Sequence, residues 1–407
     1  MSFSIFVFGL LILFFFLFLK NEKRKHDPSI ETVPIRIHIN GTRGKSSVTR
    51  LIHSILVEEG WKVFAKTTGS VPSLLFPDRN ERRIFRNKIS IGEQGSFLRF
   101  ASTNDAQAVV LECMAVQPRY QKESEEILVQ ATHTVLTNVR PDHGEWTQSE
   151  EEIWKGFSET IPKEGILILG SSVTNSKAAT YFETIADQRK TNVVNAEMPN
   201  GETSYSSDFI QTALLSLRYP EHPENVEVAV RVCKTLGVTE TSILSGIAKT
   251  FPDPGALRIT ETEFEGNKQR FVFAFAANDT VSWNSILQET RKTGKDKKQS
   301  FDSVVVVFNS KQERPIRTME FAKFFSKKEE FSKIYFFGAW KNLFRSFYQG
   351  NAELIFCKND FCFDENECQR GSHLWIGAGN FQGPGRTRLS EFVERIQTEH
   401  GDGAHVG

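Results

Sequence analysis

The residues best suited to chemistry lie in one short glycine-rich stretch, Asn40-Gly41-Thr42-Arg43-Gly44-Lys45-Ser46-Ser47. Glycines let a backbone curl until successive N–H groups point at one anion, and a helix that starts there adds its positive end. Lys45 offers an ammonium to the terminal phosphates of a nucleotide, and the Ser46 hydroxyl can bind Mg²⁺. The first glycine of the usual pattern would stand at Ile39, so this is the shorter variant G-T-x-G-K-S.

The segments on either side of this stretch can hold it in place. Ile35–Asn40 (IRIHIN) has the composition of a strand. The next segment, Ser46–Glu59, has the apolar period of an amphipathic helix, at Val48, Leu51, Ile52, Ile55 and Leu56. A strand, a tight turn and a helix in this order predict a nucleotide phosphate-binding loop.

Further short runs are apolar throughout rather than alternating, which is typical of parallel strands covered on both faces. They are Lys62–Lys66, Ala108–Glu112, Thr134–Val139 and Gly165–Gly170. With the helical segments between them, they predict an α/β domain with a mostly parallel sheet.

A glutamate and a histidine that could bind metal ions stand at or after the ends of two of these runs. Glu112 ends one run, where ligands bind in open α/β sheets, and we expect it to hold Mg²⁺ opposite Ser46. His143, beside Asp142, follows Thr134–Val139 and could bind a second metal ion or could simply be solvated. The spacing leaves both interpretations open.

A second series of strands begins after a boundary near Asp253–Thr262. These strands are predicted at Phe271–Asn278, Ser303–Asn309, Lys333–Gly338, Ala352–Cys357 and His373–Gly379. We therefore expect an ATP-binding domain over 34–255, including a helix near Asn225–Leu236, and a smaller Rossmann-like α/β domain over 256–400. Residues 401–407 look like a disordered tail.

The first residues predict a membrane anchor. Ser2–Leu19 carries no charge and as a helix would be about 27 Å long, close to the thickness of a bilayer core. Lys20, Lys23, Arg24 and Lys25 follow at once, which by the positive-inside rule keeps the rest of the chain in the cytoplasm. We expect a single-pass anchor in the cell membrane over 1–20 and a basic linker over 21–33. A cleaved signal peptide would need basic residues before the run and small residues after it.

Composition excludes other classes of protein. The 407 residues include 50 basic and 50 acidic side chains, and a net charge of zero argues against nucleic-acid binding as the main activity. With 39% hydrophobic residues the chain is not disordered as a whole. Five cysteines, odd in number and sparse, indicate thiols rather than a disulfide framework, and hence a reducing compartment.

Several motifs together resemble one family, the ligase subunit of poly-γ-glutamate synthase (PgsB/CapB), a membrane-anchored relative of the Mur ligases and folylpolyglutamate synthetase. They are GTRGKSS, ECMAVQPRYQ, NVRPDH, DPGALR, FAAND and GAGN. The resemblance implies a Mur-ligase-like fold and an ATP- and Mg²⁺-dependent amide ligase. Its substrates would be glutamate and a poly-γ-glutamate chain, and its partners other membrane subunits of the synthase.

The resemblance also implies roles for individual residues. Gly41, Thr42, Arg43, Gly44, Lys45 and Ser47 would surround the phosphates, while Ser46 and Glu112 would bind one metal ion and His143 a second. Asn225 would contact the adenine, Arg258 the ATP phosphates and Asp279 the ribose. The catalytic residues would be Lys45, Glu112, His143 and Arg258, and a tentative glutamate site would be Asn309, Arg314 and Arg317.

Some points stay open. The carbamylated lysine of many Mur ligases has no recognisable counterpart, although Lys163 and Lys177 lie in the general region. Asn225 could be a helix cap, Arg258 a surface ion-pair residue and Asp279 a turn residue. Two other functions compete: a membrane-anchored ATPase that powers export, and a related ligase with another acceptor such as a folate.

Overall fold

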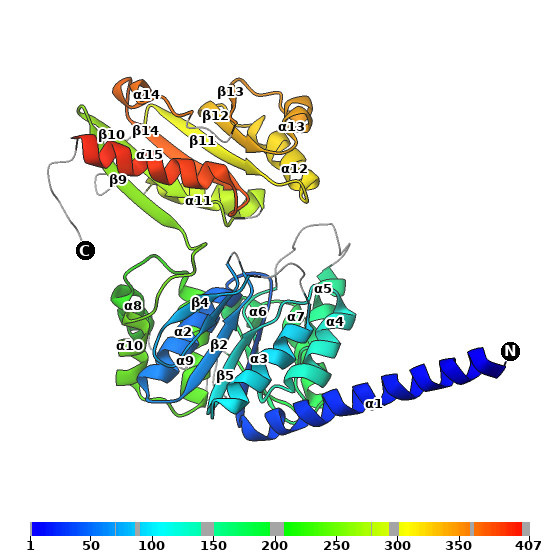
Figure 1. Ribbon diagram of the computed structural model, residues 1–407. Helices are drawn as coiled ribbons and strands as arrows, with labels where there is room; N and C mark the ends of the chain where they lie inside the picture. Colours follow the sequence, from blue (N-terminus) through cyan, green and yellow to red (C-terminus); the bar gives the residue numbers. More distant parts are fainter. Residues whose placement is uncertain are drawn as a thin grey trace. The chain divides into compact units, whose positions relative to one another are not determined.

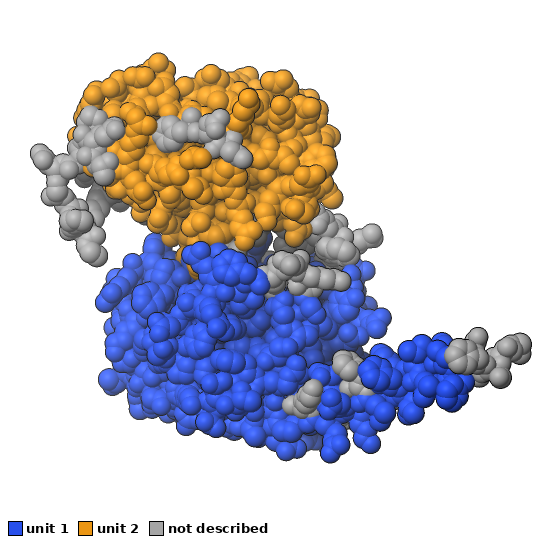
Figure 2. All heavy atoms as spheres, in the orientation of Figure 1, with its two compact units in different colours: residues 1–253 blue, residues 254–407 orange. Residues whose placement is uncertain are grey.

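The computed structural model describes residues 2–69, 71–85, 90–139, 150–195, 207–277, 279–292, 301–358 and 362–400. The chain divides into two compact units, residues 1–253 and 254–407, which are coloured separately in Figure 2. Each unit has its own sheet and its own apolar core.

The sheet of unit 1 has eight strands in the order β4-β3-β2-β5-β1-β6-β7-β8 (Figure 1). The strands are β1 (Ile35–Asn40), β2 (Val63–Thr67), β3 (Ser73–Leu75), β4 (Glu81–Arg83), β5 (Ala108–Glu112), β6 (His133–Leu136), β7 (Ile166–Leu169) and β8 (Asn192–Val194). All neighbours are parallel except at the edge, where β3 pairs antiparallel with both β2 and β4. This confirms the predicted α/β fold with a mostly parallel sheet.

Helices cover both faces of this sheet, which is why its central strands are apolar throughout. The helices of unit 1 are α1 (Ser2–Thr32), α2 (Lys45–Glu58), α3 (Gly92–Thr103), α4 (Pro118–Glu123), the π-helix η1 (Ser124–Val129), α5 (Glu150–Ser158), α6 (Ser171–Thr174), α7 (Ala178–Gln188), α8 (Ser207–Ser216), α9 (Pro223–Thr235) and α10 (Glu240–Ala248). On β5, Val110 packs in the core that includes α2 and α9, whereas Val109 and Leu111 pack in the core that includes α3.

Unit 2 has a six-stranded sheet in the order β13-β12-β11-β14-β10-β9, parallel except for the β9–β10 hairpin (Figure 1). Its strands are β9 (Arg258–Phe264), β10 (Asn267–Phe273), β11 (Ser303–Ser310), β12 (Phe331–Gly338), β13 (Glu353–Phe356) and β14 (His373–Gly379). Its helices are α11 (Thr280–Lys292), α12 (Pro315–Phe325), α13 (Lys341–Phe347), α14 (Asn366–Gln369) and α15 (Pro384–His400).

The predicted strand Phe271–Asn278 is wrong at both ends, because β10 begins at Asn267 and ends at Phe273. Glu265 and Gly266 have φ values of 48° and 80° and make the turn of a hairpin, so β10 starts earlier to pair with β9. The short hairpin β3–β4 was not predicted either, because strands of three residues carry too little pattern.

The N-terminal segment is one helix, α1, from Ser2 to Thr32, so residues 21–32 extend this helix rather than forming a separate linker. Its last turns are tied to α3: Thr32 Oγ1 lies 2.6 Å from Ser102 Oγ, and Glu22 Oε2 lies 3.8 Å from an Arg99 nitrogen. Within the part of the chain that the structure describes, no helix is both long and apolar enough to cross a membrane.

The cysteines correct a second expectation. Cys357 follows β13 and is bonded to Cys362, with their α-carbons 6.2 Å apart, whereas Cys113, Cys233 and Cys368 are buried thiols. The spacing of the two cysteines in the sequence did not predict this disulfide, because a disulfide requires their α-carbons to lie close together in the folded chain. The inference of a reducing compartment, which rested on five thiols, loses that support.

A buried ionic pair joins the first strand to the π-helix. His38 Nδ1 on β1 lies 2.8 Å from Glu125 Oε2 on η1, and the two side chains are 0% and 4% exposed. Burial acts to lower the pKa of His38, but hydrogen bonds with Cys113 and Glu125 outweigh it and raise the pKa to about 10. The imidazole is therefore charged at neutral pH.

Replacing Glu125 with Gln should destabilise unit 1 by about 3 kcal/mol, because the buried imidazolium loses its counter-charge. Since the pKa of His38 is raised from 6.5 to about 10 on folding, its stabilisation is complete below pH 6.5 and declines as the pH rises toward 10. Urea unfolding at several pH values should show a steeper alkaline decline in the wild type than in E125Q. Parallel curves would contradict this account.

Candidate active site

The glycine-rich loop lies between β1 and α2, and two of its residues need to be glycine. Gly41 and Gly44 have φ values of 124° and 80°, where side chains are strained. A β-carbon on Gly41 would lie 2.3 Å from Thr137 Oγ1, and one on Gly44 would lie 2.1 Å from Asn225 Oδ1. The loop therefore packs against the end of β6 and against α9 with no room for side chains.

The loop is fixed to the end of β6 by its own amides. The Thr42 N–H donates to the Asn138 carbonyl oxygen over 3.1 Å, and the Arg43 N–H donates to Asn138 Oδ1 over 3.0 Å. The Gly41 N–H donates to Asn40 Oδ1 over 2.8 Å. These three amides hold the loop, so they do not point freely at a ligand as the sequence alone suggested.

The amides available to an anion lie one step further along the chain. Among the contacts of the described residues, the N–H groups of Gly44, Lys45, Ser46 and Ser47 have no protein acceptor. They form the first turn of α2, a helix of 14 residues, whose end carries a partial positive charge. Phosphate oxygens are the natural acceptors for this turn.

Lys45 adds a mobile positive charge at the same place. Its ammonium donates to the carbonyl oxygens of Gly41 and Thr42, over 2.6 and 3.3 Å, so it folds back over the loop. Carbonyl oxygens are weaker partners for an ammonium than phosphate oxygens. The side chain can exchange these bonds for contacts with a nucleotide.

Ser46 and Glu112 meet beside the loop, as predicted. Ser46 Oγ donates to Glu112 Oε2 over 2.8 Å, and the Thr68 N–H donates to the same oxygen over 2.7 Å. A hydroxyl and a carboxylate this close are hard oxygen donors that fit Mg²⁺ or Mn²⁺. Among the described residues, no group of three or more His, Cys, Asp or Glu side chains could hold a metal ion together.

Asn225 also lies at the loop. It is buried in the first turn of α9, next to Gly44, and its Nδ2 donates to Glu221 Oε1 over 2.8 Å. The cap of α9 is His222, whose Nδ1 accepts the Glu224 N–H over 3.3 Å. The interpretation of Asn225 as a helix cap is therefore wrong.

Two predicted nucleotide residues belong to unit 2. The Arg258 guanidinium lies over the Phe273 ring, 3.8 Å from its centre, and donates to Ser390 Oγ over 2.8 Å. Burial lowers the pKa of Arg258, and the charge of Glu394 opposes this effect. Asp279 Oδ1 accepts the Ser282 N–H over 2.7 Å, so this carboxylate caps α11.

The tentative glutamate residues do not form one open site. Asn309 is buried, its Nδ2 donates to the Asn380 carbonyl oxygen and its Oδ1 accepts the Gly385 N–H. Asn309 thus joins β11 to the chain after β14, and a bound ligand would not reach its amide. Arg317 Nη1 donates to Asn380 Oδ1 over 2.6 Å, and Arg314 stands just before α12. The sequence assigned no role to Asn380 of the GAGN motif, although it bonds to both Asn309 and Arg317.

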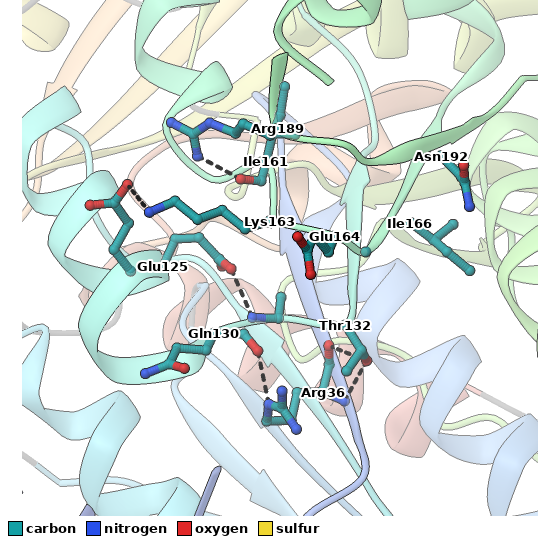
Figure 3. A pocket seen from close by; sticks show the side chains of 13 residues that line it. Arg36, Glu125, Gln130, Thr132, Ile161, Lys163, Glu164, Ile166, Arg189 and Asn192 are labelled. Atoms are coloured by element: carbon teal, nitrogen blue, oxygen red, sulfur yellow. Dashed lines mark hydrogen bonds and ion pairs between the residues drawn. The ribbon is translucent and has the colours of Figure 1, made fainter. Parts of the chain in front are cut away.

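The remaining expectations concern His143, the 401–407 tail and Lys163. His143 lies outside the described residues, as does the 401–407 tail. Lys163 lines a cavity of about 640 Å³ at the amino ends of β1, β6, β7 and β8, with Arg36, Thr132, Ile166 and Asn192 (Figure 3). Its Nζ lies 3.5 Å from Glu126 Oε1. Phosphate loops follow the carboxyl ends of strands, so this cavity is on the other edge of the sheet.

Comparison with known proteins agrees with the fold and the loop. Residues 39–228 match the Mur ligase middle domain, and residues 259–395 match the poly-gamma-glutamate synthase CapB C-terminal domain. The chain is 35% identical to PGA synthase CapB of Bacillus subtilis (strain 168) over 74% of each chain. It is 32% identical to the capsule biosynthesis protein CapB of Bacillus anthracis, over 78% of this chain and 66% of the relative.

A similar solved structure is a bifunctional folylpolyglutamate synthase/dihydrofolate synthase with Mn, AMPPNP and L-glutamate bound. It has a TM-score of 0.60 and 13% identity, and the match covers 92% of this chain and 94% of the other. At this identity the likeness concerns the fold alone. The family-model match and the curated CapB relatives define an ATP-dependent ligase of the Mur type. Within that class, the chain belongs to the CapB family of poly-γ-glutamate synthases.

Replacing Gly44 with Ala should weaken binding of a fluorescent ATP analogue about tenfold or more, since the added carbon meets Asn225 Oδ1 and the positive φ is strained. Gly60→Ala is the matched control, because Gly60 has a φ of 91° but nothing within 4 Å. G60A should cost about 1 kcal/mol of stability and leave nucleotide affinity unchanged. Equal affinities in G44A and G60A would argue against the loop as the nucleotide site.

Proposed function

We propose that this protein extends poly-γ-glutamate, using ATP to activate the terminal carboxylate of the chain. A carboxylate oxygen attacks the γ-phosphorus and the bond to ADP breaks, which gives an acyl phosphate. The amine of the next glutamate, after losing a proton, attacks the acyl carbon, and inorganic phosphate leaves. The CapB relatives support the substrate, and the pairing of Ser46 with Glu112 beside the loop is the observation that carries the proposal.

The first step brings two anions together, so positive charge must collect around the phosphates. The ammonium of Lys45 and the first-turn amides of α2 would supply part of it. A divalent ion, which we propose to be Mg²⁺, would be held by Ser46 and Glu112 and would neutralise charge on the phosphate oxygens. We also propose that His143 binds a second metal ion. Nucleotide binding would be completed by Asn225 at the adenine, Asp279 at the ribose and Arg258 at the phosphates.

Glutamate recognition needs cations for its carboxylates. Arg314 and Arg317, near the carboxyl end of β11, are the candidates in unit 2, because guanidinium groups pair with carboxylates through two parallel hydrogen bonds. Asn309 and Asn380 would hold this segment in place, since they bond to each other's backbone.

We further propose that residues 2–19 anchor the protein in the cell membrane as a single span, with both units in the cytoplasm. Apolar side chains of α1 are exposed to solvent, for example Phe6 at 64%, Phe8 at 65% and Phe14 at 70%, which is costly in water. A growing polymer that must leave the cell also gives a reason to place the ligase beside other membrane subunits.

The purified protein with ATP, Mg²⁺ and labelled glutamate tests the reaction. The proposal expects one ADP for each new amide bond, with either D- or L-glutamate as the monomer. ATP hydrolysis that does not depend on glutamate would instead favour an ATPase that powers export. Extension of a folate by glutamate would favour the folate-type ligase.

Lys45→Ala should lower glutamate-dependent ADP formation by about two to three orders of magnitude, since charge stabilisation at the phosphates is lost. Lys62→Ala is the control, because this lysine lies just beyond α2, is half exposed and is 3.9 Å from Asp105. K62A should turn over at the wild-type rate. Near-normal turnover by K45A would remove Lys45 from the mechanism.

Deleting residues 2–19 should release the protein from membranes and leave ATP binding unchanged, because the contacts of Glu22 and Thr32 with α3 are kept. Phe85→Ser is the control, since this side chain is 92% exposed elsewhere in unit 1. Fractionation of cells that express each variant measures the result. A truncated protein that still sediments with membranes would contradict the proposed anchor.

A further inference from the structure

Arg50 is a buried side chain on the same helix as the proposed metal ligand. It lies four residues after Ser46 on α2, so both side chains are on the same face of the helix. Its guanidinium forms a bidentate pair with Glu81 on β4, over 2.9 and 2.7 Å, and only 3% of the side chain is exposed. This pair fixes the phosphate-loop helix to the β3–β4 hairpin.

The other edge of the same guanidinium faces the end of unit 1. Arg50 Nε lies 3.7 Å from Asp253 Oδ2, and Asp253 is the last residue of the unit. The opposing charges of Glu81 and Asp253 keep the pKa of Arg50 raised, although burial acts to lower it. One arginine therefore connects a helix, a hairpin and the end of unit 1.

Gly69 links this ionic cluster to the metal pair. A β-carbon on Gly69 would lie 2.5 Å from Ser46 Oγ and 3.9 Å from Asp253 Oδ2, so Gly69 is close to both side chains. The residue before it, Thr68, gives its amide to Glu112 Oε2. The segment Thr68–Gly69 thus bonds to one proposed metal ligand, Glu112, and lies close to the other, Ser46, and to the carboxylate that faces Arg50.

The space beside Arg50 does not suit a ligand. Arg50, Glu81 and Arg79 line a hollow of only about 30 Å³, which is the size of one water molecule. A buried bidentate arginine in such a place restricts motion of the segments that it joins, because a planar fork allows few alternative geometries. Its effect on chemistry would pass through the position of Ser46 and of Thr68–Gly69.

We infer that Arg50 is a positioning residue for the metal site: it holds Ser46 Oγ and the Thr68–Gly69 segment at the correct places around Glu112. This inference rests on the proposed function, since it presupposes that Ser46 and Glu112 bind the metal ion of a nucleotide. Partners outside the ligand shell that orient metal ligands commonly change metal affinity by about 10- to 100-fold.

The test compares Arg50→Lys with Arg79→Lys in the full chain. Arg79 ties the same hairpin to the far end of α2, through Ser54 Oγ at 2.7 Å and Glu58 at 2.6 Å, so R79K disturbs a similar contact away from the metal pair. The measurement is the Mg²⁺ concentration at half-maximal binding of a fluorescent ATP analogue, together with binding without metal and urea unfolding.

R50K should raise the Mg²⁺ midpoint about tenfold and change metal-free nucleotide affinity by less than about twofold, whereas R79K should leave the midpoint unchanged. Loss of stability in R50K without a change of midpoint would overturn the inference, as would equal midpoint shifts in the two variants. If the wild-type protein itself showed no Mg²⁺-dependent nucleotide binding, the proposed function would fail instead.

Discussion

The close packing of a four-residue turn onto the end of β6 is the constraint on which the rest of the site depends. Asn138 accepts the amides of Thr42 and Arg43, and both Thr137 Oγ1 and Asn138 Nδ2 donate to the Arg43 carbonyl oxygen. Gly41 and Gly44 permit this because a side chain at either position would overlap a neighbour. Once the turn is held, α2 begins at Lys45, and no acceptor within the described part of the chain takes the amides of Gly44 to Ser47.

The other parts of the site follow from the order of neighbouring strands. The loop follows β1, Glu112 ends β5 and Thr68 follows β2, and these three strands are adjacent and parallel. Because neighbouring parallel strands end at the same edge of the sheet, their carboxyl ends bring a cationic turn, a carboxylate and an amide together there. The cavity at the opposite edge contains charges that already pair within the unit, such as Lys163 with Glu126.

The sequence predicted those features that depend on local pattern. The glycine, lysine and serine spacing located the loop, and an apolar run that ends in a carboxylate located Glu112. The sequence could not predict which loop amides bond within the protein, because their acceptor is Asn138, almost 100 residues further along the chain. Asn309 is similar: the resemblance to the polymer ligases suggested that it binds glutamate, but only the fold reveals that Asn380 and Gly385 occupy its amide. The disulfide, the short hairpin and the buried pair of His38 with Glu125 also depend on contacts between distant residues.

A crystal structure of the protein with AMPPNP and Mn²⁺ tests the central claim most directly, because the anomalous signal locates the metal without assumptions. The account predicts a manganese peak within about 2.5 Å of both Ser46 Oγ and Glu112, with phosphate oxygens on the amides of Gly44 to Ser47. A nucleotide bound elsewhere, or a metal ion that touches neither residue, would contradict it.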